Sequence, residues 1–177
     1  SKDKNTRKHW ADLIQTKTLR AYTNEDIIGV EIGGSVKNIL AIAAGIASGL
    51  GYGINTQAAL ITRGLAEMTR LGKSMNANES TFVGLSGLGD LVLTCSDDLS
   101  RNRRFGKELA KGNNVEHALT NVGATVEGLN TLDLILSIAG EQQVEMPICE
   151  QVHLVTLGKV SPAQALNHLM SREQIDE

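Results

Sequence analysis

The most constraining feature of this sequence is a long apolar segment that contains a single charged residue. The segment opens with the glycine-rich residues 33–38 and continues through residues 39–50. Lys37 is the only charged residue between Glu31 and Arg63. Because the isoleucines recur with helical rather than strand spacing, we expect a helix that buries one apolar stripe.

Small residues share the expected helix face of Lys37. At 3.6 residues per turn, Gly33 and Gly34 lie one turn before Lys37 on the same face. The face continues through four further small residues: Ala41, Ala44, Gly45 and Ser48. Such a face lets a ligand or a second helix approach closely, and a desolvated lysine has a lowered pKa that suits proton transfer. Residue chemistry alone favours a simpler alternative, a lysine stem lying along apolar surface with its ammonium in water.

Composition narrows the class of protein. The 177 residues suffice for one domain, or one domain and a fragment of another, and aromatic residues make up only 3 %. Scarce aromatics and many small residues suit closely packed helices, and a net charge of -3 gives no indication of a nucleic-acid partner. Cys95 and Cys149 match no metal spacing, so we expect buried, reduced thiols in a cytosolic protein. The longest apolar run is shorter than a membrane span, and no signal peptide is visible.

Capping residues and periodicity predict a chain of helices after a short mixed start. Residues 1–16 suit an amphipathic helix and residues 18–23 a strand. Asn24 is the expected N-cap of the helix that runs to residue 50, and Asn55 or Thr56 the N-cap of a helix that ends at Gly72. Further helices are expected over residues 79–85, from Ser100 to Gly112, and over 115–121, 127–139, 147–157 and 161–170.

The residues after Ser100 form the clearest candidate for an anion site. If Ser100 caps a helix, free backbone N–H groups gather there with the guanidinium groups of Arg101, Arg103 and Arg104. A solvated basic face is an equally good interpretation of this cluster. Asp90 follows a glycine turn and could share a face with Thr94, although the commoner role for such an aspartate is an N-cap. No glycine-rich stretch has the order of a dinucleotide or phosphate loop, and the histidines have no metal-ligand spacing.

Five motifs in order resemble a known family. They are Gly-Gly-Ser-Val-Lys-Asn (33–38), Gly-Tyr-Gly-Ile-Asn (51–55), Thr-Arg-Gly-Leu-Ala-Glu-Met (62–68), Gly-Leu-Gly-Asp-Leu (87–91) and Ser-Arg-Asn-Arg-Arg (100–104). Together they resemble the C-terminal part of bacterial NAD(P)-dependent glycerol-3-phosphate dehydrogenase. The resemblance implies a mainly α fold, with residues 24–177 as an all-helical substrate-binding domain of the 6-phosphogluconate dehydrogenase C-terminal-like type. Residues 1–23 would be a short α/β remnant, the tail of a truncated Rossmann domain that binds NAD.

The resemblance also implies roles for individual residues. Lys37 would be the catalytic proton donor and acceptor and would contact the substrate. The remaining substrate-binding residues would be Asp90, Ser100, Arg101 and Asn102, with Thr94 as a weaker candidate. The cofactor, NAD or NADP, would be contacted by Arg101, Thr125 and Glu127. Thr125 departs from the valine of the family's V-x-E element, which puts a side-chain role at this position in doubt, and no metal is implied.

The expected activity is the interconversion of sn-glycerol 3-phosphate and dihydroxyacetone phosphate for glycerophospholipid synthesis. We expect a cytoplasmic homodimer with a small-molecule substrate, no nucleic acid and no membrane span, and a fragment that is inactive alone. An alternative from a different class is a helical dimerisation or interaction module without catalysis.

Overall fold

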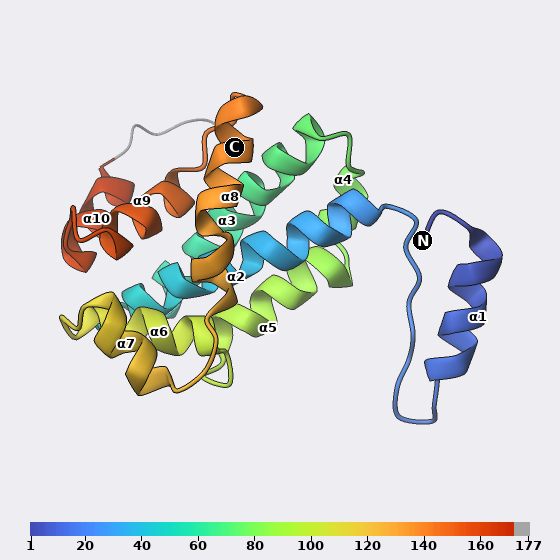
Figure 1. Cartoon of the computed structure of the whole chain (residues 1–177), viewed down its shortest axis with the longest axis horizontal. Helices are drawn as coiled ribbons and strands as arrows, with labels where there is room; N and C mark the ends of the chain where they lie inside the picture. Colours follow the sequence, from blue (N-terminus) through green and yellow to red (C-terminus); the bar gives the residue numbers. More distant parts are fainter. Residues whose placement is uncertain (172–177) are drawn as a thin grey trace.

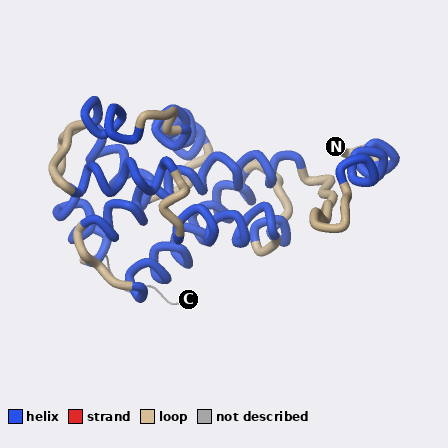
Figure 2. Tube along the Cα trace, turned by 90° about the horizontal axis from the view of Figure 1, so that it is seen from below, coloured by secondary structure: helices blue, strands red, loops and turns tan. Residues whose placement is uncertain are grey.

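The structure is a computed structural model that describes residues 1–171, and within this range it contains helices and loops but no strand (Figure 2). The predicted mainly α fold is therefore confirmed. The elements in chain order are α1 (Lys4–Ile14), α2 (Ile27–Gly49), α3 (Ile54–Ser74), α4 (Glu79–Phe82), a π-helical turn (Leu85–Gly89), α5 (Asp90–Ser96), α6 (Arg101–Ala110), α7 (Val115–Val122), α8 (Glu127–Glu141), α9 (Pro147–Thr156) and α10 (Pro162–Met170).

The apolar segment forms α2, which crosses the centre of the helical body (Figure 1). It packs against α3, α5, α6 and α8, and its residues from Val36 to Ala47 are buried apart from Lys37. By length and hydropathy this helix could cross a membrane, but 61 % of its most apolar window is buried among the other helices. Burial of that kind is what a core helix of a bundle requires.

Two glycines allow α2 and α6 to cross with their backbones in contact. A Cβ atom at Gly45 would lie 2.0 Å from the carbonyl oxygen of Arg103, and one at Gly106 would lie 2.1 Å from the carbonyl oxygen of Ile42. Any larger residue at either position would push the helices apart. The small-residue face of α2 therefore packs against α6 at Gly45, about two turns after Lys37. Lys37 lies outside this close contact.

The N-terminal segment differs from the prediction. α1 forms as expected but buries none of its residues and lies to one side of the helical body (Figures 1 and 2). Residues 18–23 form no strand, so the strand expected in this segment is wrong. A strand requires a neighbour to satisfy its backbone groups, and the described residues supply none.

Most helix ends follow the sequence signals, and the exceptions have tertiary causes. Ser100 caps α6, Ser161 forms a capping box with Gln164, and Pro147 opens α9, all as predicted. The predicted N-cap Asn24 is wrong, because Asp26 takes this position and accepts from Gly29 N–H.

The other differences concern α3 and the segment after it. α3 begins after Gly53 rather than at an Asn55 or Thr56 cap, and it continues through Gly72 to Ser74. The helix expected over residues 79–85 is the shorter α4, followed by the π-helical turn. Both cysteines are buried and free as predicted, and burial raises the pKa of Cys95 to about 12.

Candidate active site

The lysine of the central helix is paired with the aspartate that begins α5. Lys37 Nζ lies 2.5 Å from Asp90 Oδ2, and the two side chains are 21 % and 34 % exposed. The ammonium is therefore held by a carboxylate rather than left in water. Asp90 is the first residue of α5 and Gly89 occupies the N-cap, so the commoner interpretation of Asp90 as a cap is wrong. A half-buried pair of this kind interacts more strongly than one in bulk solvent and remains within reach of a small molecule.

The π-helical turn brings Asp90 to Lys37 by resting directly on α2. A Cβ atom at Gly33 would lie 2.6 Å from the carbonyl oxygen of Ser86, so only glycine permits this approach. One turn into α5, the Thr94 hydroxyl donates to the Asp90 carbonyl at 2.6 Å and lies 3.3 Å from Asp90 Oδ1. Thr94 therefore contacts the same Asp90 carboxylate that pairs with Lys37.

Buried amides join three helices beside this pair. Asn102 Nδ2 of α6 donates to Asn38 Oδ1 of α2 at 3.0 Å, and Asn38 Nδ2 donates to Glu127 Oε2 of α8 at 3.2 Å. Asn102 Oδ1 accepts from Gly128 N–H at 2.9 Å. These bonds hold residues 37–38 against the starts of α6 and α8.

Asn38 is the site residue that the sequence reasoning missed. It is 7 % exposed and follows Lys37 directly, which places it on the adjoining face of α2. An amide within a buried helix must find hydrogen-bond partners from other elements. Its position inside an otherwise apolar segment was the signal that could have identified it.

The basic residues after Ser100 separate into inward and outward groups. Ser100 Oγ accepts from Arg103 N–H at 3.2 Å, and the Arg103 side chain turns inward to pair with Asp98. Arg101 and Arg104 are exposed, and no carboxylate in residues 1–171 pairs with Arg101. A free guanidinium at a helix start can bind an anion such as a phosphate.

The residues predicted to contact a dinucleotide lie at the accessible edge of this group. Thr125 and Glu127 are exposed, with Glu127 at the start of α8, and Arg101 is exposed at the start of α6. A Cβ atom at Gly34, one turn before Lys37, would meet no atom within 4 Å. The exposure of these residues and the open helix face at Gly34 leave room for a cofactor.

Other parts of the molecule offer less chemistry. Within the described part of the chain, no group of three metal-ligating side chains lies together. A recess of about 580 Å³ lies between the α6–α7 and α9–α10 loops and contains none of the predicted site residues. The candidate side chains lie instead on α2 and at the starts of α5, α6 and α8.

Residues 26–167 match the model of the family described as NAD-dependent glycerol-3-phosphate dehydrogenase C-terminus. The chain belongs to this family. It is 77 % identical over its whole length to a glycerol-3-phosphate dehydrogenase [NAD(P)+] from Ruthia magnifica subsp. Calyptogena magnifica, of which it covers 55 %. It is also 52 % identical over its whole length to the Legionella pneumophila (strain Paris) protein of the same name, of which it covers 54 %.

A solved glycerol-3-phosphate dehydrogenase from Coxiella burnetii has the same fold. It superposes with a TM-score of 0.93 over 96 % of this chain and 52 % of the Coxiella chain, at 45 % identity. The chain thus spans about half the length of the curated relatives it matches. Membership of a dehydrogenase family does not favour the alternative of an interaction module without catalysis.

Proposed function

We propose that this chain is the substrate domain of an NAD(P)-dependent glycerol-3-phosphate dehydrogenase, which interconverts sn-glycerol 3-phosphate and dihydroxyacetone phosphate. The observation that carries this proposal is the Lys37–Asp90 pair at the junction of α2 and α5. Residues 24–177 would form the substrate half of the site. A preceding dinucleotide-binding domain, whose tail would be residues 1–23, would supply the other half, so the chain alone would be inactive.

In this reaction Lys37 acts as general acid and general base. Bound NADH or NADPH supplies the hydride that reduces the ketone carbon. The Lys37 ammonium donates a proton to the developing alkoxide, and in the reverse direction the neutral amine accepts the hydroxyl proton. Asp90, at 2.5 Å from Lys37 Nζ, orients the ammonium.

The start of α6 would hold the phosphate group. Arg101 supplies a guanidinium without a carboxylate partner in the described residues, and Ser100 supplies a hydroxyl that can still donate. Asn102 uses its carbonyl oxygen and one N–H within the amide network, which leaves one N–H for substrate. An anchored phosphate is bound alike in the ground state and the transition state, so this contact contributes chiefly to substrate binding.

Arg101, Thr125 and Glu127 are the residues we propose for cofactor contact, with NAD or NADP as the cofactor. The proposal extends to a cytoplasmic homodimer that provides glycerol phosphate for phospholipid synthesis. The cofactor contacts are supported by the family and by the exposure of the three residues.

The test is the substitution Lys37→Ala in the full-length enzyme, in which this chain follows a dinucleotide-binding domain. With dihydroxyacetone phosphate and NADH or NADPH, turnover should fall by about 10²-fold or more, the usual cost of losing a general acid. Lys73→Ala is the matched control, because Lys73 forms an exposed pair with Glu79 at 3.0 Å. Turnover of Lys37→Ala equal to that of Lys73→Ala would remove Lys37 from the mechanism.

A further inference from the structure

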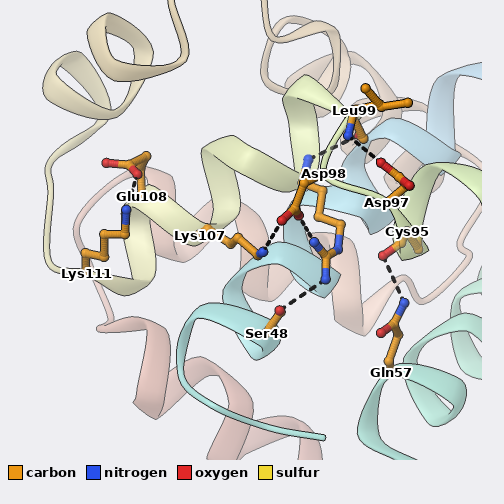
Figure 3. Close-up of polar contacts among 11 residues, drawn as sticks. Ser48, Gln57, Cys95, Asp97, Asp98, Leu99, Lys107, Glu108 and Lys111 are labelled. Atoms are coloured by element: carbon orange, nitrogen blue, oxygen red, sulfur yellow. Dashed lines mark hydrogen bonds and ion pairs between the residues drawn. The ribbon is translucent and has the colours of Figure 1, made fainter. Parts of the chain in front are cut away.

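The loop between α5 and α6, residues 97–100, is held in place by charged side chains rather than by apolar packing. Asp98 pairs through one carboxylate oxygen with the Arg103 guanidinium and through the other with Lys107, whose Nζ lies 2.5 Å away (Figure 3). Leu99, the only apolar residue of this loop, is 88 % exposed. The position of the loop therefore depends on the Asp98 carboxylate.

Arg103 connects this loop to the central helix. Its guanidinium also donates to Ser48 Oγ near the end of α2 at 3.1 Å, and its side chain is only 9 % exposed. Arg103 Nε has no partner in the described chain, so Asp98 and Ser48 are all that satisfies this guanidinium. The backbone of Arg103 is also fixed in place, because its carbonyl packs directly against Gly45 of α2. A guanidinium buried this deeply is strongly disfavoured without its carboxylate, which holds Asp98 in place.

The fastened loop joins two parts of the candidate active site. α5 carries Asp90 at its start, and α6 begins at Arg101 directly after the loop. Arg103, which pairs with Asp98 through its side chain, also donates its backbone N–H to the Ser100 hydroxyl. A displaced loop would move Ser100 and Arg101 relative to Asp90 while leaving the Lys37–Asp90 pair intact.

We propose that Asp98 and Arg103 are positioning residues whose ion pair, supported by Lys107 and Ser48, fixes Ser100 and Arg101 to receive the substrate phosphate. This inference rests on the proposed function. Neither residue touches the substrate, and each acts through the start of α6. The Asp98–Arg103 ion pair positions the residues that bind the substrate phosphate and does not contact Lys37. Loss of this ion pair therefore weakens substrate binding more than it slows proton transfer.

Asp98→Asn tests this role, because it keeps the size of the side chain and removes its charge. In the full-length enzyme the KM for dihydroxyacetone phosphate should rise about tenfold, with kcat changed by less than about twofold, the pattern expected when ground-state and transition-state binding are lost together. Asp98→Glu retains the carboxylate at a position that is 55 % exposed, and should bring KM back to within about threefold of wild type. Lys111→Ala is the control, because it removes a 62 % exposed lysine from the end of the same helix and should change neither constant.

The outcomes separate this inference from the proposed function. An active wild type whose KM is unchanged by Asp98→Asn, or whose KM rises equally with Asp98→Glu, overturns the positioning role alone. A wild type that does not reduce dihydroxyacetone phosphate overturns the proposed function and this inference with it. If Asp98→Asn does not fold, Ser48→Ala removes the second partner of Arg103 and should raise KM about threefold, and an unchanged KM then overturns the inference equally.

Discussion

Asp90 and Glu67 are both acidic residues of the helical body, yet their surroundings differ in almost every respect. Asp90 is 34 % exposed and its carboxylate meets another side chain, Lys37. Glu67 of α3 is 1 % exposed and accepts from the backbone N–H groups of Ile148 at 2.7 Å and Cys149 at 3.4 Å, at the start of α9. The difference indicates that a carboxylate bound to buried backbone serves the fold, whereas one that faces a half-open lysine is available for chemistry.

The titration of Glu67 reflects its enclosure. Burial raises the pKa of Glu67 to about 7, against the lowering effect of the two backbone hydrogen bonds. α9 has no side-chain cap of its own, so the Glu67 carboxylate takes the place of an N-cap. The comparison therefore predicts that substitutions at the two acidic positions separate activity from stability.

The largest expected effect is on activity. Asp90→Asn in the full-length enzyme removes the charge that orients the Lys37 ammonium, and turnover should fall by about 10²-fold. The midpoint of thermal unfolding should change little, because Asp90 is partly exposed and its pair contributes about 1 kcal/mol or less. Steady-state kinetics measure the turnover and a melting curve measures the unfolding midpoint. Normal turnover in this variant would contradict the catalytic role assigned to Asp90.

Glu67→Ala should show the opposite pattern. The substitution leaves two buried N–H groups without an acceptor and opens a cavity, so the free energy of unfolding should fall by about 3 kcal/mol. The kcat of the protein that remains folded should equal that of the wild type. Urea unfolding followed by circular dichroism measures the loss, and a stability equal to wild type would show that α9 needs no partner from α3.

The pH dependence of stability sharpens the same point. Glu67 binds its proton more tightly in the folded state, with a pKa of about 7 against the ordinary 4.5, so its contribution favours the folded state most below pH 4.5 and is lost as the pH rises to about 7. Over this window the group should lower the free energy of unfolding by about 3 kcal/mol. Glu67→Gln cannot titrate, so its stability should be flatter between pH 5 and about 7, as urea unfolding at several pH values would show.

Asp26 does not interfere with that measurement. Burial alone would raise its pKa, but hydrogen bonds from Gly29 N–H, the Thr81 hydroxyl and Asn78 N–H lower the pKa below the ordinary 3.8. A lowered pKa gives stability that is complete above 3.8 and lost as the pH falls through the folded-state value. The two carboxylates therefore affect stability in different pH ranges. A slope that persists in Glu67→Gln would assign the titration to another group.

The smallest expected effects concern two adjacent glycines. Gly33→Ala places a Cβ atom 2.6 Å from the Ser86 carbonyl oxygen and should push the π-helical turn, and Asp90 with it, away from α2. We expect a loss of about 1–3 kcal/mol in stability together with reduced turnover. Gly34→Ala meets no atom and should stabilise α2 by up to about 1 kcal/mol. Equal unfolding midpoints for the two variants would contradict this account of how Asp90 is placed.

Local signals in the sequence predicted most of the helices and singled out Lys37, whereas the role of Asp90 beside it came from the family resemblance. Ser100, Ser161 and Pro147 each begin a helix as their chemistry requires. Lys37 stood out because charge is rare in a buried helix. These features depend on residues close in sequence, which is why periodicity and capping rules could identify them.

The features that the sequence did not reveal depend on distant partners. Asp26 rather than Asn24 caps α2, because the Thr81 hydroxyl and Asn78 N–H also bind its carboxylate. α3 runs through Gly72 because the Phe82 ring packs 2.1 Å from where a Cβ would lie. The polarity of Asn38 within an apolar segment is a local signal, but its partners Asn102 and Glu127 lie on two other helices, which no local pattern shows.

The central claim is that one ligand spans Lys37 and the start of α6. A crystal structure of the full-length enzyme with dihydroxyacetone phosphate and NAD or NADP bound tests it most directly. The account predicts the ketone oxygen about 3 Å from Lys37 Nζ and the phosphate in contact with Arg101. A phosphate bound elsewhere, such as in the recess between the α6–α7 and α9–α10 loops, with Lys37 away from the ketone, would contradict it.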